Sequence, residues 1–195
     1  MGSNIHRIGL FGGSFDPVTY GHLLLAQAAR EELELDRLFL IPAAQSPLKP
    51  GSQPAPAADR LRMLRLSLAG RPEFEIDGQE IARGGVSYTI DTMRDYVLRY
   101  PDAKFYYLIG SDLIPQLPKW READELAKLL EVAIIPRPGE PVGDLPPPFR
   151  GRALKGFPLG VSSSNVRARV KAGLPIDWLV PPAVAEVIRN NRLYL

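Results

Sequence analysis

The stretch GLFGGSFDPVTYGHLLLAQAAR, residues 9–30, decides the fold of this chain. A short apolar run, Ile5–Phe11, leads into Gly12 and Gly13, and good helix formers follow from Leu23 to Leu33. The apolar run predicts a buried strand, and a row of leucine, alanine, arginine and glutamate favours a helix. The sequence therefore opens with a strand, a glycine-rich turn and a helix.

The same alternation continues along the chain. Further strands are predicted at Arg37–Ile41, Phe74–Ile76, Lys104–Ile109 and Val132–Ile135, and helices at Asp59–Ala69, Ser87–Tyr100, Glu122–Leu130, Ser163–Ala172 and Ala183–Asn190. Asp59 and Ser87 are expected to cap their helices, and the stretches 42–58 and 138–149 to be loops. This order predicts an α/β fold, a Rossmann-like doubly wound parallel sheet of about five to six strands with helices on both faces.

Length and composition limit the class of protein. The 195 residues fit a single domain over 1–195, which we divide into an α/β core at 5–160 and a C-terminal helical segment at 161–195. The net charge of +2, without a long basic run, does not indicate nucleic acid as a partner. No apolar run reaches the roughly 18 residues of a membrane span and no signal peptide is visible, so we expect a cytoplasmic protein without a membrane partner.

The cysteine and histidine counts exclude disulfides, thiol catalysis and a zinc site. The chain has no cysteine, so it has neither disulfides nor thiol nucleophiles. Its two histidines, His6 and His22, do not form the ligand pattern of a zinc site.

Three predicted strands end in conspicuous turns, at Gly12-Gly13, at Pro42 and at Gly110. In an open parallel sheet, ligands bind beyond the carboxyl ends of the strands. We therefore expect the functional site at this edge of the sheet.

The turn after the first strand suits a phosphate. Gly12 and Gly13 let a ligand approach bare backbone N–H groups, and Thr19 precedes a helix whose first turn holds Gly21 and His22. A helix N-terminus attracts anions, and a histidine there can donate a hydrogen bond to a phosphoryl oxygen. The turn is neither a Walker loop nor the Gly-x-Gly-x-x-Gly of dinucleotide oxidoreductases.

Two motifs in the right order resemble the signatures of the nucleotidylyltransferase superfamily. The first is Gly-x-Phe-Asp-Pro followed by Thr19-Tyr20-Gly21-His22, and the second is VSSSNVRARV, residues 161–170, which matches Ser-Ser-x-x-x-Arg at the start of a helix. Nearly the whole chain is similar to the bacterial nicotinate-mononucleotide adenylyltransferases, through SPLKP (46–50), DRLRML (59–64), SYTIDTM (87–93), YLIGSDLIPQLPKW (107–120) and LVPPAVAEVIRNNRLY (179–194). Thr19 and Leu48 stand where close relatives often have histidine.

The resemblance implies transfer of the adenylyl group of ATP to nicotinate mononucleotide, with Mg²⁺ held mainly by phosphate oxygens and water rather than by protein ligands. Catalytic roles fall to His22 and Arg167. The ATP-binding candidates are Gly12, Gly13, Ser14, Thr19, Gly110, Asp112, Ser162, Ser163 and Ser164, with Arg137 as a further possibility beside the nucleotide. Those for the acceptor are Lys49 at its phosphate, Tyr88 and Thr89 at the nicotinate carboxylate, and Trp120 stacked on the ring.

Other interpretations stay open at this point. Taken alone, the second motif is a plain serine N-cap with a surface arginine, Asp112 another helix cap, and Trp120 a core residue. Another acceptor such as phosphopantetheine, or a nucleotide sensor without catalysis, would use the same two motifs. A nucleic-acid-binding domain would need a basic, aromatic stripe that the sequence lacks. Oligomeric state does not follow from the sequence.

Overall fold

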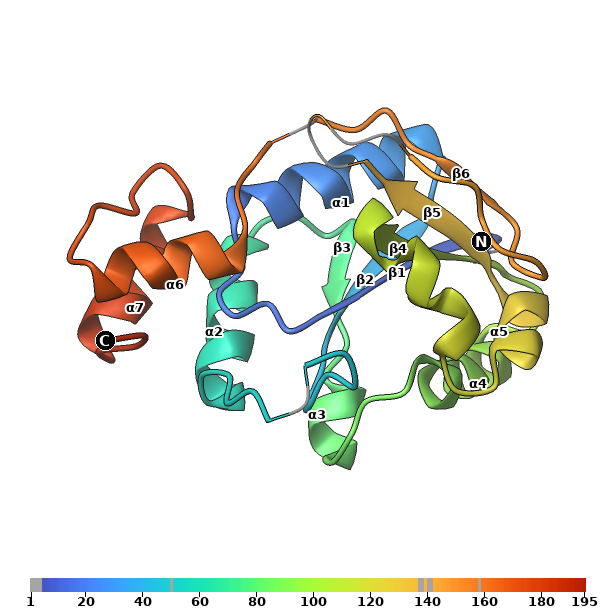
Figure 1. The fold of residues 1–195 in the computed structure, drawn as a ribbon, viewed down its shortest axis with the longest axis horizontal. Coiled ribbons are helices and arrows are strands. Elements are labelled where there is room, and N and C mark those ends of the chain that lie inside the picture. Colours follow the sequence, from blue (N-terminus) through green and yellow to red (C-terminus); the bar gives the residue numbers. More distant parts are fainter. Residues whose placement is uncertain (1–4, 50, 137–138, 140–141, 158) are drawn as a thin grey trace.

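The computed structural model of the chain describes residues 5–49, 51–136, 139, 142–157 and 159–195. Among these residues, six parallel strands form one sheet in the order β3-β2-β1-β4-β5-β6 (Figure 1). The strands are β1 (Arg7–Gly13), β2 (Arg37–Pro42), β3 (Phe74–Ile76), β4 (Lys104–Gly110), β5 (Glu131–Ile135) and β6 (Gly151–Ala153). The predicted parallel α/β sheet is confirmed.

The direction in which successive strands are added to the sheet reverses between β1 and β4. From β1 the chain moves outward to β2 and β3, then returns to place β4 on the other side of β1. The carboxyl ends of β1, β2 and β4 are therefore neighbours, and these are the strands that end at Gly12-Gly13, Pro42 and Gly110. Such a switch point leaves a crevice for a ligand.

Helices cover both faces of the sheet, as predicted (Figure 1). Side chains of α1 (Tyr20–Glu32), α2 (Ala57–Ser67), α6 (Ser163–Lys171) and α7 (Pro182–Asn190) contribute to one buried cluster. Side chains of α4 (Thr89–Arg99), the 3₁₀ helix η1 (Ser111–Lys119) and α5 (Ala123–Leu129) contribute to a second cluster on the opposite face. Strand side chains alternate between the clusters, as in Phe105 and Tyr107 against Tyr106 and Leu108.

Two predicted caps are wrong. The helix expected from Asp59 begins earlier, at Ala57, so Asp59 lies in its first turn. The helix expected from Ser87 begins at Thr89, because the Ser87 hydroxyl accepts a hydrogen bond from the Ala44 N–H at 3.0 Å. A tertiary contact thus replaces the local cap that the sequence favoured.

Two short elements were not predicted. Helix α3 (Gln79–Arg83) has only five residues, and the three residues of β6 are all exposed, so neither gives an apolar periodicity. Gly151 begins β6, where an added Cβ would lie 1.9 Å from the carbonyl oxygen of Val132. The predicted loop 42–58 is shorter in the structure, 43–56, because Pro42 ends β2 and α2 begins at Ala57, and the loop 138–149 falls partly outside the described residues.

Candidate active site

The first motif forms the capped start of α1. Thr19 is the N-cap: its hydroxyl oxygen accepts from the N–H of His22 at 3.4 Å, and its own N–H donates to Nδ1 of His22 at 3.1 Å. Thr19 is fully buried, at 0% exposure, so its side chain orients His22 and does not face solvent. Because Nδ1 accepts this hydrogen bond, the proton of a neutral His22 imidazole is on Nε2. His22 is thereby prepared as a hydrogen-bond donor.

The surroundings of His22 keep it uncharged. Its ring centroid lies 6.0 Å from that of Phe11 and 5.2 Å from that of Phe15. Burial, with a smaller contribution from the charge of Lys49, lowers the pKa of His22 to about 4. At neutral pH the imidazole can therefore hydrogen-bond a phosphate but does not add a charge to it.

We expect the His22 imidazole to titrate near pH 4 rather than near its usual pKa of about 6.5. Because the folded pKa is depressed, the neutral imidazole stabilises the fold fully above pH 6.5, and this contribution is lost as the pH falls through about 4. An NMR titration of imidazole-labelled protein measures the pKa directly, and a His6→Gln variant removes the only other histidine signal. Titration of His22 above pH 6 would contradict the lowered pKa.

The second motif lies against the first. The hydroxyl of Ser162 caps α6 by accepting from the Asn165 N–H at 3.2 Å, and the hydroxyl of Ser163 donates to the Pro17 carbonyl at 2.8 Å. An added Cβ on Gly21 would be 2.6 Å from the carbonyl oxygen of Val161, so only glycine permits this approach. Segments 146 residues apart therefore build one site.

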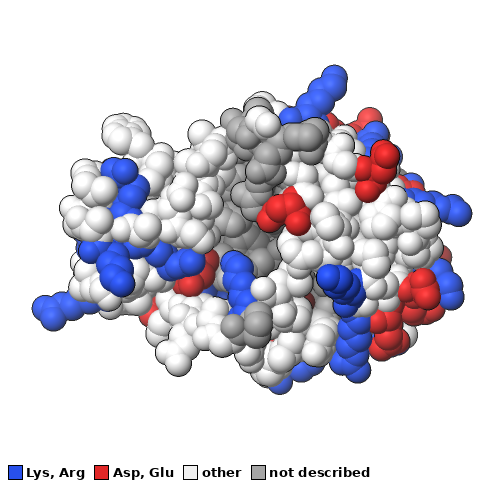
Figure 2. All heavy atoms as spheres, in the orientation of Figure 1, with Lys and Arg blue, Asp and Glu red and all other residues white. Residues whose placement is uncertain are grey.

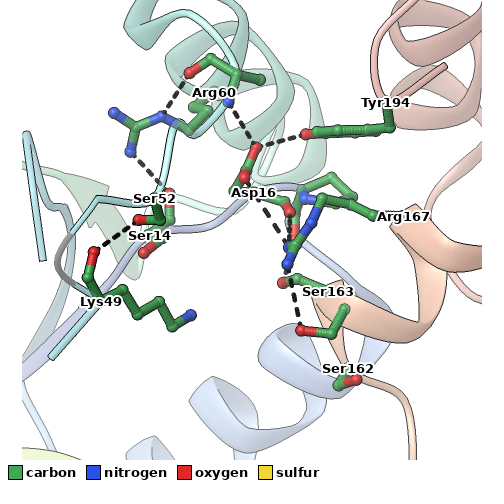
Figure 3. Close-up of polar contacts among 12 residues, drawn as sticks. Ser14, Asp16, Lys49, Ser52, Arg60, Ser162, Ser163, Arg167 and Tyr194 are labelled. Atoms are coloured by element: carbon green, nitrogen blue, oxygen red, sulfur yellow. Dashed lines mark hydrogen bonds and ion pairs between the residues drawn. The ribbon is translucent and has the colours of Figure 1, made fainter.

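Arg167 extends from α6 to the first motif (Figure 3). Its Nη1 donates to the backbone carbonyl of Asp16 at 2.7 Å, and its Nη2 donates to the hydroxyl of Ser164 at 3.2 Å. The side chain remains 35% exposed, so its guanidinium can also contact a ligand. In Figure 2, basic side chains gather on the part of this face formed by α6 and α7, which suits an anionic ligand.

The loop after β2 supplies a further cation. Lys49 is exposed, and in Figure 3 its side chain extends toward the side of the site where Ser163 and Arg167 lie. The loop is attached to the first motif by Arg60, which is 2% exposed and donates from Nη1 to the carbonyls of Ser14 and Ala43, both at 2.8 Å. Gly12, Gly13 and Ser14 are themselves partly exposed beside this loop.

Three of the acceptor candidates, Tyr88, Thr89 and Trp120, gather on the opposite face of the sheet, around Tyr107. The hydroxyl of Thr89 donates to that of Tyr107 at 3.4 Å, and the rings of Tyr107 and Trp120 meet edge to face at 5.8 Å. Tyr88 is partly buried on this same face. A Cβ added to Gly12 would lie 2.1 Å from the Tyr107 hydroxyl. Gly12 therefore lies between the residues around Tyr107 and the phosphate motifs.

Gly110 and Asp112 complete the set at the carboxyl end of β4. Gly110 is the last residue of the strand and Asp112 is an exposed residue in the first turn of η1. Because β4 pairs with β1, both are placed at the edge of the sheet that carries the first motif. Arg137 lies outside the described residues.

Sequence reasoning missed four residues of the site: Asp16, Arg60, Tyr107, and Tyr194, whose hydroxyl donates to Oδ1 of Asp16 at 2.8 Å. Asp16 was read only as part of the signature, and Tyr107 and Tyr194 only as parts of similar segments. A charged residue inside the apolar spacing of α2 was the available signal for Arg60, since a buried arginine requires partners.

The described residues contain neither a candidate metal cluster nor a membrane-spanning helix. No group of three or more histidine, cysteine, aspartate or glutamate residues there could hold a metal ion. None of the helices in the same residues combines the length and the apolar character that a membrane crossing requires.

Comparison with known proteins places this geometry in a family. The model of the cytidylyltransferase-like family matches residues 10–169, a range that holds both motifs. A probable nicotinate-nucleotide adenylyltransferase of Opitutus terrae is 43% identical to the chain, over 96% of this chain and 97% of the relative. The chain belongs to the nicotinate-nucleotide adenylyltransferases.

Other nicotinate-nucleotide adenylyltransferases are also similar to the chain. A probable member from Geobacillus kaustophilus is 40% identical over 96% of this chain and 86% of its own length. Among solved structures, the Plasmodium falciparum nicotinic acid mononucleotide adenylyltransferase complexed with NaAD has a TM-score of 0.79 with 20% identity, and 97% of each chain is covered. This structure supports the fold.

Proposed function

We propose that the chain transfers the adenylyl group of ATP to nicotinate mononucleotide, giving nicotinate adenine dinucleotide and pyrophosphate in NAD biosynthesis. The observation that carries the proposal is the contact of the two motifs, Arg167 on Asp16 and Ser163 on Pro17, in a chain 43% identical to a probable enzyme of this kind. It unites a donor-rich helix start with an arginine, which suits a triphosphate.

The reaction needs no general base from the protein. The phosphate of the acceptor is already ionised near neutral pH, attacks the α-phosphorus of ATP in line, and displaces pyrophosphate. Catalysis then consists of holding two polyanions together and stabilising charge on the transferring group. The neutral His22 of this site is suited to donating a hydrogen bond and not to removing a proton.

We assign the roles as follows. His22 donates from Nε2–H to the α-phosphate, with Thr19 fixing the tautomer. The backbone around Gly12, Gly13 and Ser14 and the serines at the start of α6 bind the phosphates of ATP, together with Arg167, and Asp112 accepts from ribose hydroxyls. Mg²⁺ enters with ATP, bound by phosphate oxygens and water.

The acceptor is assigned to two places: its nicotinate ring to the other face of the sheet, and its phosphate to the loop after β2. Lys49 pairs with the phosphate of nicotinate mononucleotide, Trp120 stacks on its ring, and Tyr88 and Thr89 contact its carboxylate. With Gly12 between the two groups, a dinucleotide product would lie across the edge of the sheet at β1.

A coupled assay for the dinucleotide product tests this function. We expect turnover with nicotinate mononucleotide and weaker turnover with nicotinamide mononucleotide, because the amide lacks the negative charge of the carboxylate. Pyrophosphate release measured with other acceptors, including phosphopantetheine, tests the alternative within the superfamily. Absence of dinucleotide formation with ATP, Mg²⁺ and nicotinate mononucleotide would reject the proposal in favour of another acceptor or a nucleotide sensor.

A further inference from the structure

Three distant segments meet at Asp16, which is buried with 6% exposure (Figure 3). Its Oδ1 accepts from the N–H of Ala55 at 3.0 Å and from the hydroxyl of Tyr194 at 2.8 Å. Its backbone carbonyl accepts from Nη1 of Arg167 at 2.7 Å. Asp16 thus connects the first motif to the loop before α2, to α6 and to residue 194.

The Asp16 carboxylate also competes with a phosphate for the Arg167 guanidinium. Its Oδ2 lies 3.9 Å from Nη1 of Arg167, too far for a hydrogen bond but close enough for attraction. If the carboxylate turned toward Arg167, the two would form a closer ion pair, and the guanidinium would be less available to a phosphate. The donors on Oδ1 oppose this rotation, and Tyr194 provides one of them.

The geometry of Tyr194 fits this restraining contact. Its φ of +66° is in the left-handed region that residues other than glycine seldom adopt, and such a conformation persists only where its surroundings hold it. The side chain packs against the buried cluster that contains Leu193 and Phe15. Burial and the nearby Asp16 carboxylate raise the pKa of Tyr194, so its hydroxyl stays protonated and donates.

We propose that Tyr194 is a positioning residue for adenylyl transfer: by holding the Asp16 carboxylate, it keeps the Arg167 guanidinium available to the triphosphate. Tyr194 acts through Asp16 and Arg167 and is not itself a catalytic residue. The inference rests on the proposed function, in which Arg167 binds the phosphates of ATP.

The Tyr194→Phe variant removes only the hydroxyl group. We expect the KM for ATP and the Kd for tripolyphosphate to rise about tenfold, as for loss of a hydrogen bond to a charged group, with the KM for nicotinate mononucleotide unchanged. Tyr96→Phe is a matched control, because Tyr96 donates to Asp77 at 2.7 Å on the other face of the sheet. It should lower the melting temperature without changing affinity for ATP.

A double-mutant cycle tests whether Tyr194 acts through the arginine. In an Arg167→Lys background, Tyr194→Phe should change the KM for ATP by less than about twofold, because the group it positions is already lost. The proposal is overturned if Tyr194→Phe leaves tripolyphosphate affinity at the wild-type value, or if its full effect persists beside Arg167→Lys.

The binding arm separates this inference from the proposed function. Tripolyphosphate binding requires no acceptor, so its dependence on Tyr194 would support the positioning role even if the wild-type protein formed no dinucleotide. In the converse result, the wild-type enzyme forms the dinucleotide while Tyr194→Phe leaves the affinity for tripolyphosphate unchanged. This result would support the proposed function and reject the positioning role.

Discussion

Replacing His22 with alanine is expected to lower kcat by about 10²–10³-fold, the usual cost of losing one donor that stabilises developing charge. The Nε2–H of His22 is the donor in question, since Nδ1 accepts from Thr19. Steady-state kinetics with saturating ATP and nicotinate mononucleotide measure the effect. A His22→Ala enzyme with wild-type kcat would remove His22 from the mechanism.

Two variants control for loss of the helix cap. His22→Asn places an acceptor near the position of Nδ1, so it should keep most of the Thr19 contact while lacking the distal N–H group. We expect it to be nearly as slow as His22→Ala but closer to wild type in melting temperature. His6→Ala, at an exposed histidine that precedes β1 at the opposite end of the strand from the first motif, should match wild type in both measurements.

Replacing Arg167 with alanine should lower kcat/KM for ATP by about 10²-fold, because two charge-assisted hydrogen bonds to phosphate are lost. Arg167→Lys keeps the charge but not the planar fork and should fall between the alanine variant and wild type. Kinetics at varied ATP and fixed acceptor measure the effect.

Arg169→Ala is the matched control on the same helix. The Arg169 side chain donates to the Pro175 carbonyl at 2.8 Å instead of to the first motif. It should leave kcat/KM for ATP unchanged. Equal losses in the Arg167 and Arg169 variants would mean that general charge, and not a directed contact, attracts ATP to α6.

The sequence predicted the architecture because the central strands are apolar runs bounded by glycine or proline. β3 was predicted with both of its bounds, Phe74–Ile76, and β2 to within one residue. Elements without such a pattern escaped prediction: β6 has no buried residue, and α4 begins two residues after the expected cap because Ser87 is used in a contact with Ala44.

The site was partly predictable for a related reason. His22 and Arg167 belong to motifs with strong local spacing, and the structure brings those motifs together. Asp16, Arg60 and Tyr194 act through contacts between residues 17 to 178 positions apart, which no local pattern encodes. The roles assigned to Tyr88, Thr89 and Trp120 remain predictions, although the structure groups them near Tyr107.

The contact between Arg167 and Asp16 closes a loop of 151 residues. Closing so long a loop costs entropy, which the folded chain has already expended before any nucleotide arrives. A triphosphate that contacts both the first motif and α6 would stabilise the contact between them. Binding to the native state alone adds RT ln(1 + [L]/Kd) to the free energy of unfolding. Bound ATP should consequently protect residues 161–195 from proteolytic cleavage.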